Sequence, residues 1–298
     1  MAILAALLAA CASTETPAPP PASLTLFGAT ATVPLLSRLI DRFQATHPST
    51  TVVLETGNST VSVQQVRAGD ATLGTVSAIP PDTLWSAPFA VDGVAVVVHR
   101  DNPLENLTLA QVRDIFGGQV WHWSDLEVQA IEDEITVLTR EEGSGTRAVF
   151  EALAMTRRDS SEANCPPVLA VDPEDHGAPE GEGCEKAPVT SMALLVPASS
   201  AMAEFIAERP GAIGYVSQGV LSAYEALSPA LKAVHIEGSA PIPDHVADGT
   251  YHLVQPFFFI SAGEPEGVAR QFVDLCLSAE GQALIAQGYV PLRAGAQD

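Results

Sequence analysis

Basic residues are scarce in this chain of 298 residues, which carries 14 Lys and Arg against 36 Asp and Glu and has a formal net charge of −22. A protein that binds a nucleic-acid backbone or an anionic lipid surface needs clustered cationic side chains to neutralise the phosphates. We therefore predict that nucleic acid is not a partner and that the chain does not dock electrostatically on lipid headgroups. A small anion can still bind, because local donors act at contact distance whereas distant charges are screened beyond about 8 Å.

Catalytic and membrane-spanning signatures are also missing from the sequence. There is no G-x-x-x-x-G-K-[ST] phosphate loop and no G-x-S-x-G nucleophile elbow. After the N-terminal stretch, no apolar run reaches the ~20 residues that a membrane-spanning helix needs. The seven His residues are scattered without metal-ligand spacing. We therefore predict that the protein is not an enzyme and uses no metal or cofactor, with a phosphatase as the enzyme alternative.

Alternating strand and helix patterns run along most of the chain, which is 47% hydrophobic and 17% charged. This composition is typical of a globular protein, and the length allows two lobes or domains. A repeated strand–turn–helix order predicts a parallel sheet with ligand-binding turns at the carboxyl ends of its strands. The predicted strands cover 23–27, 51–54, 71–77, 88–98, 134–138, 211–216 and 249–260, and the predicted helices cover 35–43, 61–68, 109–116, 147–155, 199–207, 268–277 and 280–286.

The segment at 139–150 has the composition of an anion-binding turn. A Gly-Ser-Gly-Thr string at 143–146 lies between an apolar strand and a helical pattern. Ser144 or Thr146 can cap that helix, whose first backbone N–H groups have no partner within it and carry a partial positive charge. Glycine lets a ligand approach the main chain closely. The segment therefore predicts a site for a small anion, and the alternative is a simple turn.

Arg140 lies three residues before the start of this string and can present a planar guanidinium to a tetrahedral oxyanion. Glu142, two residues later, is predicted to hold Arg140 in place by an ion pair. The alternative interpretation of Arg140 is an ordinary surface charge. The spacing of an arginine, an acid and Ser-Gly-Thr favours the binding role.

Two further turns carry hydroxyl residues at predicted helix starts. The turn at 28–34 contains Thr32 before a Pro, and the turn at 57–60 contains Ser59. Each hydroxyl is equally well explained as a helix cap when it is considered alone.

Several strings together resemble one known family. The string at 140–146 matches R-x-[DE]-x-S-G-T, the stretch at 107–125 matches L-T-x-x-Q-[LV]-R-D-I-F-x-G, and G-A-I-G-Y occurs at 211–215. With the C-terminal block at 277–292, the chain from Ser23 onward resembles the periplasmic phosphate-binding proteins, which are the substrate receptors of phosphate ABC importers.

This resemblance implies a two-lobed periplasmic-binding-protein-like (type II) α/β fold, in which each lobe has a mixed, mostly parallel sheet flanked by helices and two strands form the hinge. It implies a first lobe made of 24–92 and 252–298, and a second lobe of 93–251 with an acidic insert at 157–188. The implied partners are inorganic phosphate and ABC permease subunits, and the implied state is a monomer. The implied ligand-binding residues are Thr32, Ser59, Ser77, Arg140, Ser144, Gly145 and Thr146.

Ser77 departs from the family pattern, which has an Asp after the third strand. A carboxylate there accepts the proton of hydrogen phosphate and repels a fully ionised anion, whereas a hydroxyl both donates and accepts. Sulfate, molybdate and tungstate therefore stay open as alternative ligands. A role as a phosphate sensor also stays open.

The N-terminus and the cysteines indicate a protein outside the cytoplasm. Residues 1–10 are apolar, although they lack the basic start of a secretory signal, and 8–11 fits a lipobox that ends at Cys11. We therefore expect lipidation of Cys11, a Pro-rich tether up to residue 23, and a location in the periplasm or on the cell surface. In an oxidising compartment Cys165 and Cys184 can form a disulfide, which is preferred to a metal site there.

Overall fold

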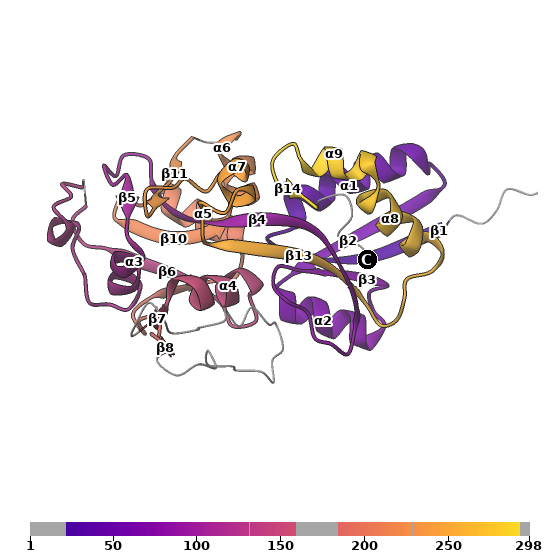
Figure 1. The fold of residues 1–298 in the computed structure, drawn as a ribbon, viewed down its shortest axis with the longest axis horizontal. Coiled ribbons are helices and arrows are strands. Elements are labelled where there is room, and N and C mark those ends of the chain that lie inside the picture. The colour runs from indigo at the N-terminus through magenta and orange to yellow at the C-terminus, as the bar shows by residue number, and fades with distance from the viewer. Residues whose placement is uncertain (1–21, 131, 159–183, 228, 293–298) are drawn as a thin grey trace, which may run out of the picture.

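Two long strands, β4 (Trp85–His99) and β13 (Val254–Ser261), run antiparallel through the middle of the molecule and join its two halves (Figure 1). The structure is a computed structural model that describes residues 22–130, 132–158, 184–227 and 229–292. In the principal sheet the strand order is β2-β1-β3-β13-β4-β10-β6-β9, and β11 and β14 also pair with β4. β4 and β13 pair antiparallel with their neighbours β10 and β3. Beyond them, the pairs β1–β2, β1–β3, β6–β10 and β6–β9 are parallel, which confirms the predicted α/β class with a mixed, mostly parallel sheet in each lobe.

The two halves of the sheet define two lobes. We call the half with β1, β2 and β3 lobe I, and the half with β6, β9 and β10 lobe II. The strands outside the crossing pair are β1 (Ala22–Ala29), β2 (Thr50–Gly57), β3 (Leu73–Val76), β5 (Asn106–Leu107), β6 (Thr136–Arg140), β7 (Thr156–Arg158), β8 (Cys184–Lys186), β9 (Leu194–Val196), β10 (Ala212–Ser217), β11 (Leu231–Ala233), β12 (His235–Ile236) and β14 (Val290–Pro291).

Helices cover both lobes (Figure 1). They are α1 (Val33–Thr46), α2 (Ser59–Ala68), α3 (Leu109–Phe116), α4 (Gly145–Ala154), α5 (Ser199–Ala207), α6 (Gln218–Glu225), α7 (Pro243–Ala247), α8 (Gly267–Leu277) and α9 (Ala279–Ile285), with a 3₁₀ turn at Trp123–Leu126. The helix predicted at 199–207 is confirmed as α5. The strand predicted at 134–138 was placed too early, because β6 continues through Arg140, so this residue belongs to the strand and not to the turn.

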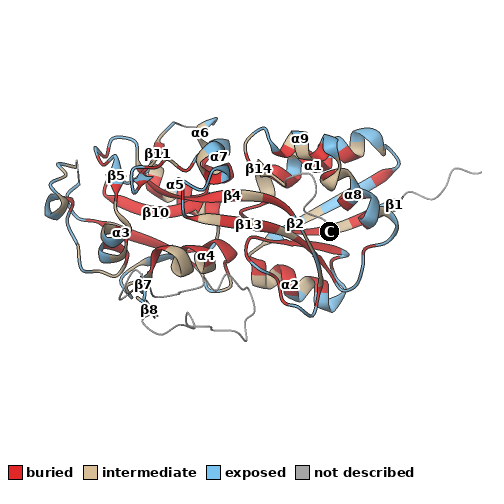
Figure 2. Cartoon of the chain, viewed as in Figure 1, coloured by how far each residue is buried: buried red, intermediate tan, exposed pale blue. Residues whose placement is uncertain are grey.

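Apolar faces at helical spacing explain how the helices attach to the sheet. The apolar face of α1 is buried in lobe I, where Phe43 packs edge-on against Phe272 of α8 at a centroid distance of 5.3 Å. In lobe II, Phe150 of α4 stacks on Tyr215 of β10 at 4.0 Å. Figure 2 shows the crossing strands β4 and β13 buried along most of their length. The stacking of Phe150 on Tyr215 fixes the N-terminus of α4 relative to the end of β6.

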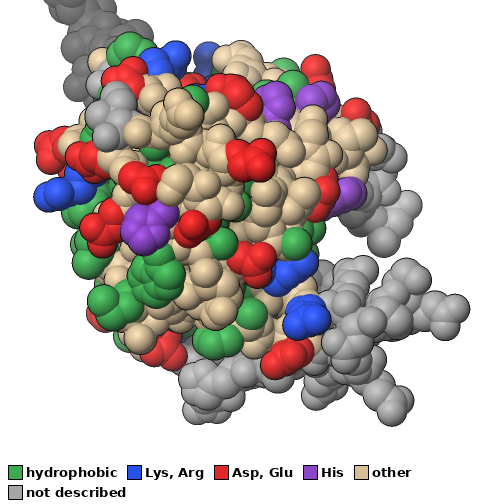
Figure 3. All heavy atoms as spheres, turned by 90° about the vertical axis from the view of Figure 1, so that its left-hand side faces the viewer, with side chains coloured by type: hydrophobic (Ala, Val, Ile, Leu, Met, Phe, Trp, Pro, Cys, Tyr) green, Lys and Arg blue, Asp and Glu red, His purple; other side chains and the backbone are tan. Residues whose placement is uncertain are grey.

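The surface agrees with the acidic composition. Viewed from the end of lobe II, Figure 3 shows acidic side chains spread over the face, with few Lys and Arg among them. No helix in the described ranges is both long and apolar enough to cross a membrane. The boundaries predicted after residues 92 and 251 remain a prediction; the first falls within β4 and the second just before β13.

Candidate anion-binding site

Arg140 is the last residue of β6, and its side chain is only 1% exposed. Its Nε and Nη2 donate to the two carboxylate oxygens of Glu141 at 2.9 and 2.8 Å. Its Nη1 donates to Ser199 Oγ at the start of α5, at 2.9 Å. A buried guanidinium needs such partners, because an unpaired charge in the interior is strongly unfavourable. The positive charge is therefore held in a fixed orientation at the carboxyl end of β6.

The predicted ion pair between Arg140 and Glu142 is wrong, because the carboxylate on Arg140 belongs to Glu141. Glu142 is exposed, and its backbone carbonyl accepts a hydrogen bond from Asn58 Nδ2 at 3.5 Å. The next residue, Gly143, has a φ of 84°, which suits glycine and turns the chain at this point. Glu142 therefore lies on the turn, whereas Glu141 is still close to the strand end.

The N-terminus of α4 follows this turn. Ser144 is the N-cap residue, and its hydroxyl accepts a hydrogen bond from the backbone N–H of Arg147 at 3.3 Å. Thr146 is 1% exposed, and its Oγ1 has no hydrogen-bond partner among the described residues. Because the first N–H groups of a helix lack intrahelical acceptors, this end offers backbone and hydroxyl donors together.

Hydroxyl groups of lobe I lie against the same helix end. Ser59 Oγ and Ser77 Oγ are 3.4 Å apart and both side chains are buried. Gly145 packs directly on them, because a Cβ at this position would come within 2.5 Å of Ser59 Oγ and 2.6 Å of Ser77 Oγ. The predicted residues Ser59, Ser77 and Gly145 are thus brought together from three strand ends.

The two lobes also touch directly around this point. The backbone N–H of Thr60 donates to the carbonyl of Gly143 at 3.1 Å, which joins the starts of α2 and α4. Arg140 Nη2 reaches Thr30 Oγ1 of lobe I at 3.4 Å. The cluster therefore lies at the junction of the lobes and has one cationic centre, several hydroxyls and a helix N-terminus.

Thr32, which was predicted as a ligand, is hydrogen-bonded inside lobe I. Its Oγ1 donates to the carbonyl of Ala29 at 2.8 Å and lies 2.7 Å from Thr75 Oγ1. Thr30, two residues earlier, is the hydroxyl of this turn that contacts Arg140. Thr30 and Ser199 were both missed at the sequence level, although Ser199 starts a helix after a strand in the same pattern as Ser59 and Ser144.

The remaining sequence predictions fall elsewhere. Cys11 and Cys165 lie outside the described residues, as does the side chain of Cys184, so lipidation and the disulfide remain predictions. Within the described ranges, no group of three or more His, Cys, Asp or Glu residues is arranged to hold a metal ion. Cys276 is buried.

Known proteins of several bacteria are similar to this chain. Residues 13–280 match the family model described as a PBP superfamily domain. The phosphate-binding protein PstS of Bacillus subtilis (strain 168) is 26% identical over 279 residues, which is 91% of this chain and 81% of that protein. An ABC-type phosphate transport receptor from Vibrio cholerae has a TM-score of 0.63 at 26% identity, covering 91% of this chain and 100% of that one.

A second solved structure has a closer overall shape. It is described as a phosphate ABC transporter substrate-binding protein from Clostridium perfringens with bound phosphate. Its TM-score is 0.74 at 22% identity, with 91% of this chain and 100% of that chain covered. At this identity the likeness establishes the fold alone.

Proposed function

The chain belongs to the PBP superfamily, and from this membership we propose that it is a substrate-binding protein that captures inorganic phosphate between its two lobes. In this proposal the protein acts outside the cytoplasm, is anchored through a lipid on Cys11, and delivers phosphate to the permease subunits of an ABC importer. It acts as a binding protein and not as an enzyme. The names of the relatives support phosphate as the ligand.

One observation carries the proposal: Arg140, the N-terminus of α4 and the paired hydroxyls of Ser59 and Ser77 converge at the lobe junction. Phosphate is a tetrahedral anion that accepts many hydrogen bonds, and hydrogen bonds to a charged partner contribute roughly 1.5–3 kcal/mol each. Arg140 would supply the charge-assisted bonds. Ser144, Gly145 and Thr146 would supply backbone and hydroxyl donors.

The lobe I residues of the site would complete the ligand shell. Ser59 would donate from this side, and Thr30 joins it because it already reaches Arg140. Thr32 would donate only after giving up its hydrogen bond to the carbonyl of Ala29. Ligand binding would then require the lobes to separate and close again through bending of the crossing strands, as hinged binding proteins do. The boundaries after residues 92 and 251 would mark this hinge.

Ser77 favours a second candidate ligand class on the same site. Its hydroxyl lies beside Ser59 and Gly145, where a carboxylate would discriminate against fully ionised anions. A hydroxyl discriminates less, because it both donates and accepts. Sulfate, molybdate or tungstate would then bind the same donors, and the protein could serve as a sensor in place of a transport receptor.

Isothermal titration of the ligand-stripped protein with phosphate and then with sulfate, at pH 6 and pH 8, tests these proposals. Saturable phosphate binding with no sulfate heat would support a phosphate receptor that discriminates without the usual carboxylate. Equal binding of both anions would support relaxed selectivity at Ser77. No heat with either anion would refute the phosphate proposal, and molybdate and tungstate would then be titrated next.

The proposed anchor and disulfide have separate tests. Full-length protein expressed in bacteria with radiolabelled palmitate should incorporate label, and Cys11→Ala should not. Labelling of free thiols before and after reduction should show that Cys165 and Cys184 become reactive together. Label on Cys11→Ala, or thiols that react without reduction, would contradict these two predictions.

A further inference from the structure

Asp92 is a buried carboxylate at the place where β4 passes from one lobe to the other. It is 2% exposed, and it is paired across the sheet with Gln255 of β13, the other crossing strand. Two residues further along, β4 begins to pair with β10 of lobe II, with Val94 opposite Ser217. Asp92 thus lies on the hinge itself, between the two ladders.

The hydrogen bonds of Asp92 connect this hinge to lobe II. The backbone N–H of Gly93 donates to Oδ1 at 2.9 Å. At the start of α6, the hydroxyl of Ser217 and the N–H of Gly219 both donate to Oδ2, the second at 3.3 Å. Gln255 Nε2 is 3.5 Å from the same oxygen. Every donor on the carboxylate is neutral.

Ser217 extends this network to lobe I. Its Oγ is also 3.3 Å from the backbone carbonyl of Ala31, in the turn that carries Thr30 and Thr32. A hydroxyl has a single proton, so it can donate to Asp92 or to Ala31 but not to both. Helices α1 and α6, which begin on the two sides of this contact, pack against each other. The proton of Ser217 therefore decides whether the two lobes are hydrogen-bonded here.

The protonation state of Asp92 determines where that proton goes. When the carboxyl is ionised, Ser217 donates to it, because hydrogen bonds to an ionised acceptor are the stronger ones. The carbonyl of Ala31 then faces the lone pairs of Ser217 Oγ and receives no hydrogen bond from it. When the carboxyl is protonated, its O–H donates to Ser217 Oγ, and Ser217 donates to Ala31. Asp92, Ser217 and Ala31 are then joined by two consecutive hydrogen bonds.

We propose that Asp92 is a positioning residue that, in its protonated form, acts through Ser217 to hold the Ala31–Thr32 turn of lobe I against lobe II. This turn also carries Thr30, whose hydroxyl contacts Arg140 at the candidate site. The effect on ligand affinity rests on the proposed function, whereas the effect on the turn does not.

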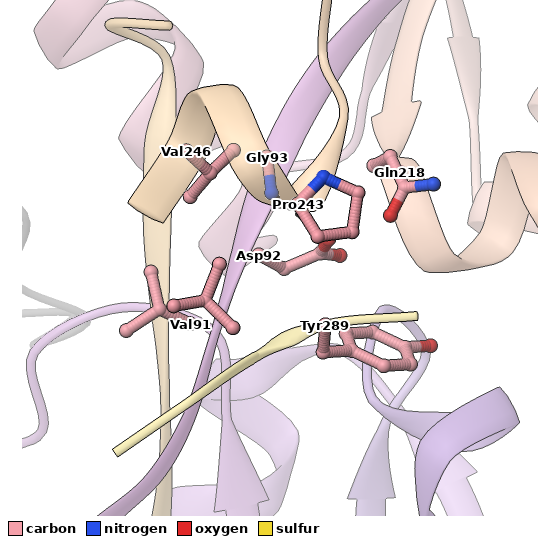
Figure 4. A pocket seen from close by; sticks show the side chains of 8 residues that line it. Val91, Asp92, Gly93, Gln218, Pro243, Val246 and Tyr289 are labelled. Atoms are coloured by element: carbon pink, nitrogen blue, oxygen red, sulfur yellow. Dashed lines mark hydrogen bonds between the residues drawn. The ribbon is translucent and has the colours of Figure 1, made fainter. Parts of the chain in front are cut away.

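The surroundings of Asp92 favour a carboxyl that gains its proton near neutral pH. Burial raises the pKa of Asp92 to about 6, although the hydrogen bonds from Ser217, Gly219, Gly93 and Gln255 oppose the rise. Figure 4 shows the carboxylate in a small pocket with Gln218, Pro243 and Tyr289 around it.

The titratable and charged groups nearest to Asp92 do not neutralise it. Of the residues that line the pocket, Asp92 and Tyr289 are the titratable ones. Burial raises the pKa of Tyr289 and that of Tyr251, so both phenols stay neutral. Arg38 of α1 lies over the Tyr289 ring at 5.4 Å, and His245 of α7 contacts Ser239 and the carbonyl of Ala240. Asp92 thus titrates as a single group.

Two variants separate the predicted states. Asp92→Asn keeps the size of the side chain and offers a permanent N–H donor to Ser217, and Gln255 can turn its unpartnered Oε1 toward the new amide. Ser217→Ala removes only the shared hydroxyl. Thermal unfolding checks that each variant is folded. If Asp92→Asn does not fold, the comparison of the wild type with Ser217→Ala tests the proposal.

The first measurement uses the full chain without ligand. Amide hydrogen exchange is followed for the turn at 29–32 from pH 5 to pH 7.5 and corrected for intrinsic rates. Because the turn loses one hydrogen bond, from Ser217 to the carbonyl of Ala31, its protection in the wild type should fall roughly three- to tenfold as the pH rises through this range. Asp92→Asn should stay protected throughout, and Ser217→Ala should stay at the wild-type level of pH 7.5. A wild-type turn without pH dependence, or Ser217→Ala with the wild-type dependence, overturns the proposal.

The second measurement is the dissociation constant of inorganic phosphate for the wild type divided by that for Asp92→Asn at each pH. The ionisation of phosphate itself cancels in this ratio. The ratio should rise roughly three- to tenfold from pH 5 to pH 7.5, for the same single hydrogen bond. A flat ratio overturns the positioning role. If the wild type binds no phosphate at any pH, the proposed function fails and the exchange measurement alone decides the role of Asp92.

Discussion

Two buried ionisable groups in this molecule, Arg140 at the candidate site and Asp92 at the hinge, have opposite surroundings. Arg140 is 1% exposed and has a carboxylate, two hydroxyls and two carbonyls around its guanidinium. Asp92 is 2% exposed and has only neutral donors. Both side chains are hydrogen-bonded, but only Arg140 has an opposite charge in contact.

This difference bears on the protonation of Asp92. A buried carboxyl without a cation in contact is more easily protonated than one that is paired with an opposite charge. The pKa of Asp92 is accordingly raised to about 6, chiefly by burial. The hinge thus carries a group that titrates, whereas the site carries a guanidinium that is paired with a carboxylate.

The largest expected effect is the loss of the Arg140 guanidinium. Arg140→Ala should weaken phosphate binding by two or more powers of ten, because at least two charge-assisted hydrogen bonds of roughly 1.5–3 kcal/mol each are removed. Isothermal titration measures the change. Arg140→Lys is the matched control, since it keeps the charge but lacks the planar fork, and it should recover part of the affinity. Unchanged affinity in Arg140→Ala would remove Arg140 from the site.

The second effect concerns the close contact between the lobes. Gly145→Ala would place a methyl group within 2.5 Å of Ser59 Oγ and 2.6 Å of Ser77 Oγ, so the closed arrangement would be overpacked by about 1–3 kcal/mol. Phosphate affinity should fall by a corresponding factor. Gly263→Ala is the control, because a Cβ there meets nothing within 4 Å. Equal affinities for the two variants would show that Gly145 does not face the ligand.

The sequence was sufficient to predict the features that local patterns encode. The strand–turn–helix order around 139–150 and a hydroxyl cap at Ser144 or Thr146 were predicted, because capping and periodicity act over a few residues; the structure places the cap at Ser144. The partner of Arg140 was not predictable in this way. It depends on where β6 ends and on the turn at Gly143, which together bring Glu141 and not Glu142 to the guanidinium.

Contacts between distant segments explain what the sequence did not reveal. Thr30 and Ser199 meet Arg140 from 110 and 59 residues away, so no local pattern marks them. Asp92 interrupts an apolar strand, and only its tertiary neighbours Ser217 and Gln255 give it a role. The convergence of Ser59 and Ser77 on Gly145 was predicted only through a family resemblance.

The third prediction uses stability to test the titrating group. The pKa of Asp92 is 3.8 when unperturbed and about 6 in the folded protein, so the folded state binds more protons between these values. The stabilisation is complete below about pH 4 and is lost as the pH rises through 6. Thermal unfolding from pH 4.5 to pH 7.5 should show the wild type losing about 1–3 kcal/mol relative to Asp92→Asn. Parallel curves for the two proteins would place the folded pKa near 3.8.

The smallest effect separates the two neighbouring acids. Glu141→Gln removes the negative charge beside Arg140, but Ser199 and the carbonyls of Val196 and Pro197 still hold the guanidinium. A phosphate dianion is then repelled less, so affinity should rise. Because the Glu141 side chain is 26% exposed and therefore partly screened, we expect roughly a three- to tenfold gain.

Glu142→Gln is the matched control for that gain, because Glu142 is exposed and makes no ion pair with Arg140 in the described structure. Its affinity for phosphate should stay within about twofold of that of the wild type, since an exposed charge that does not contact the site is largely screened. Titrations at low and high salt sharpen the contrast, because the gain from Glu141→Gln should shrink as salt rises. If Glu142→Gln raised the affinity instead, the turn at Gly143 would change on ligand binding so that Glu142 replaces Glu141 beside Arg140. The ion pair predicted from the sequence would then describe the ligand-bound state.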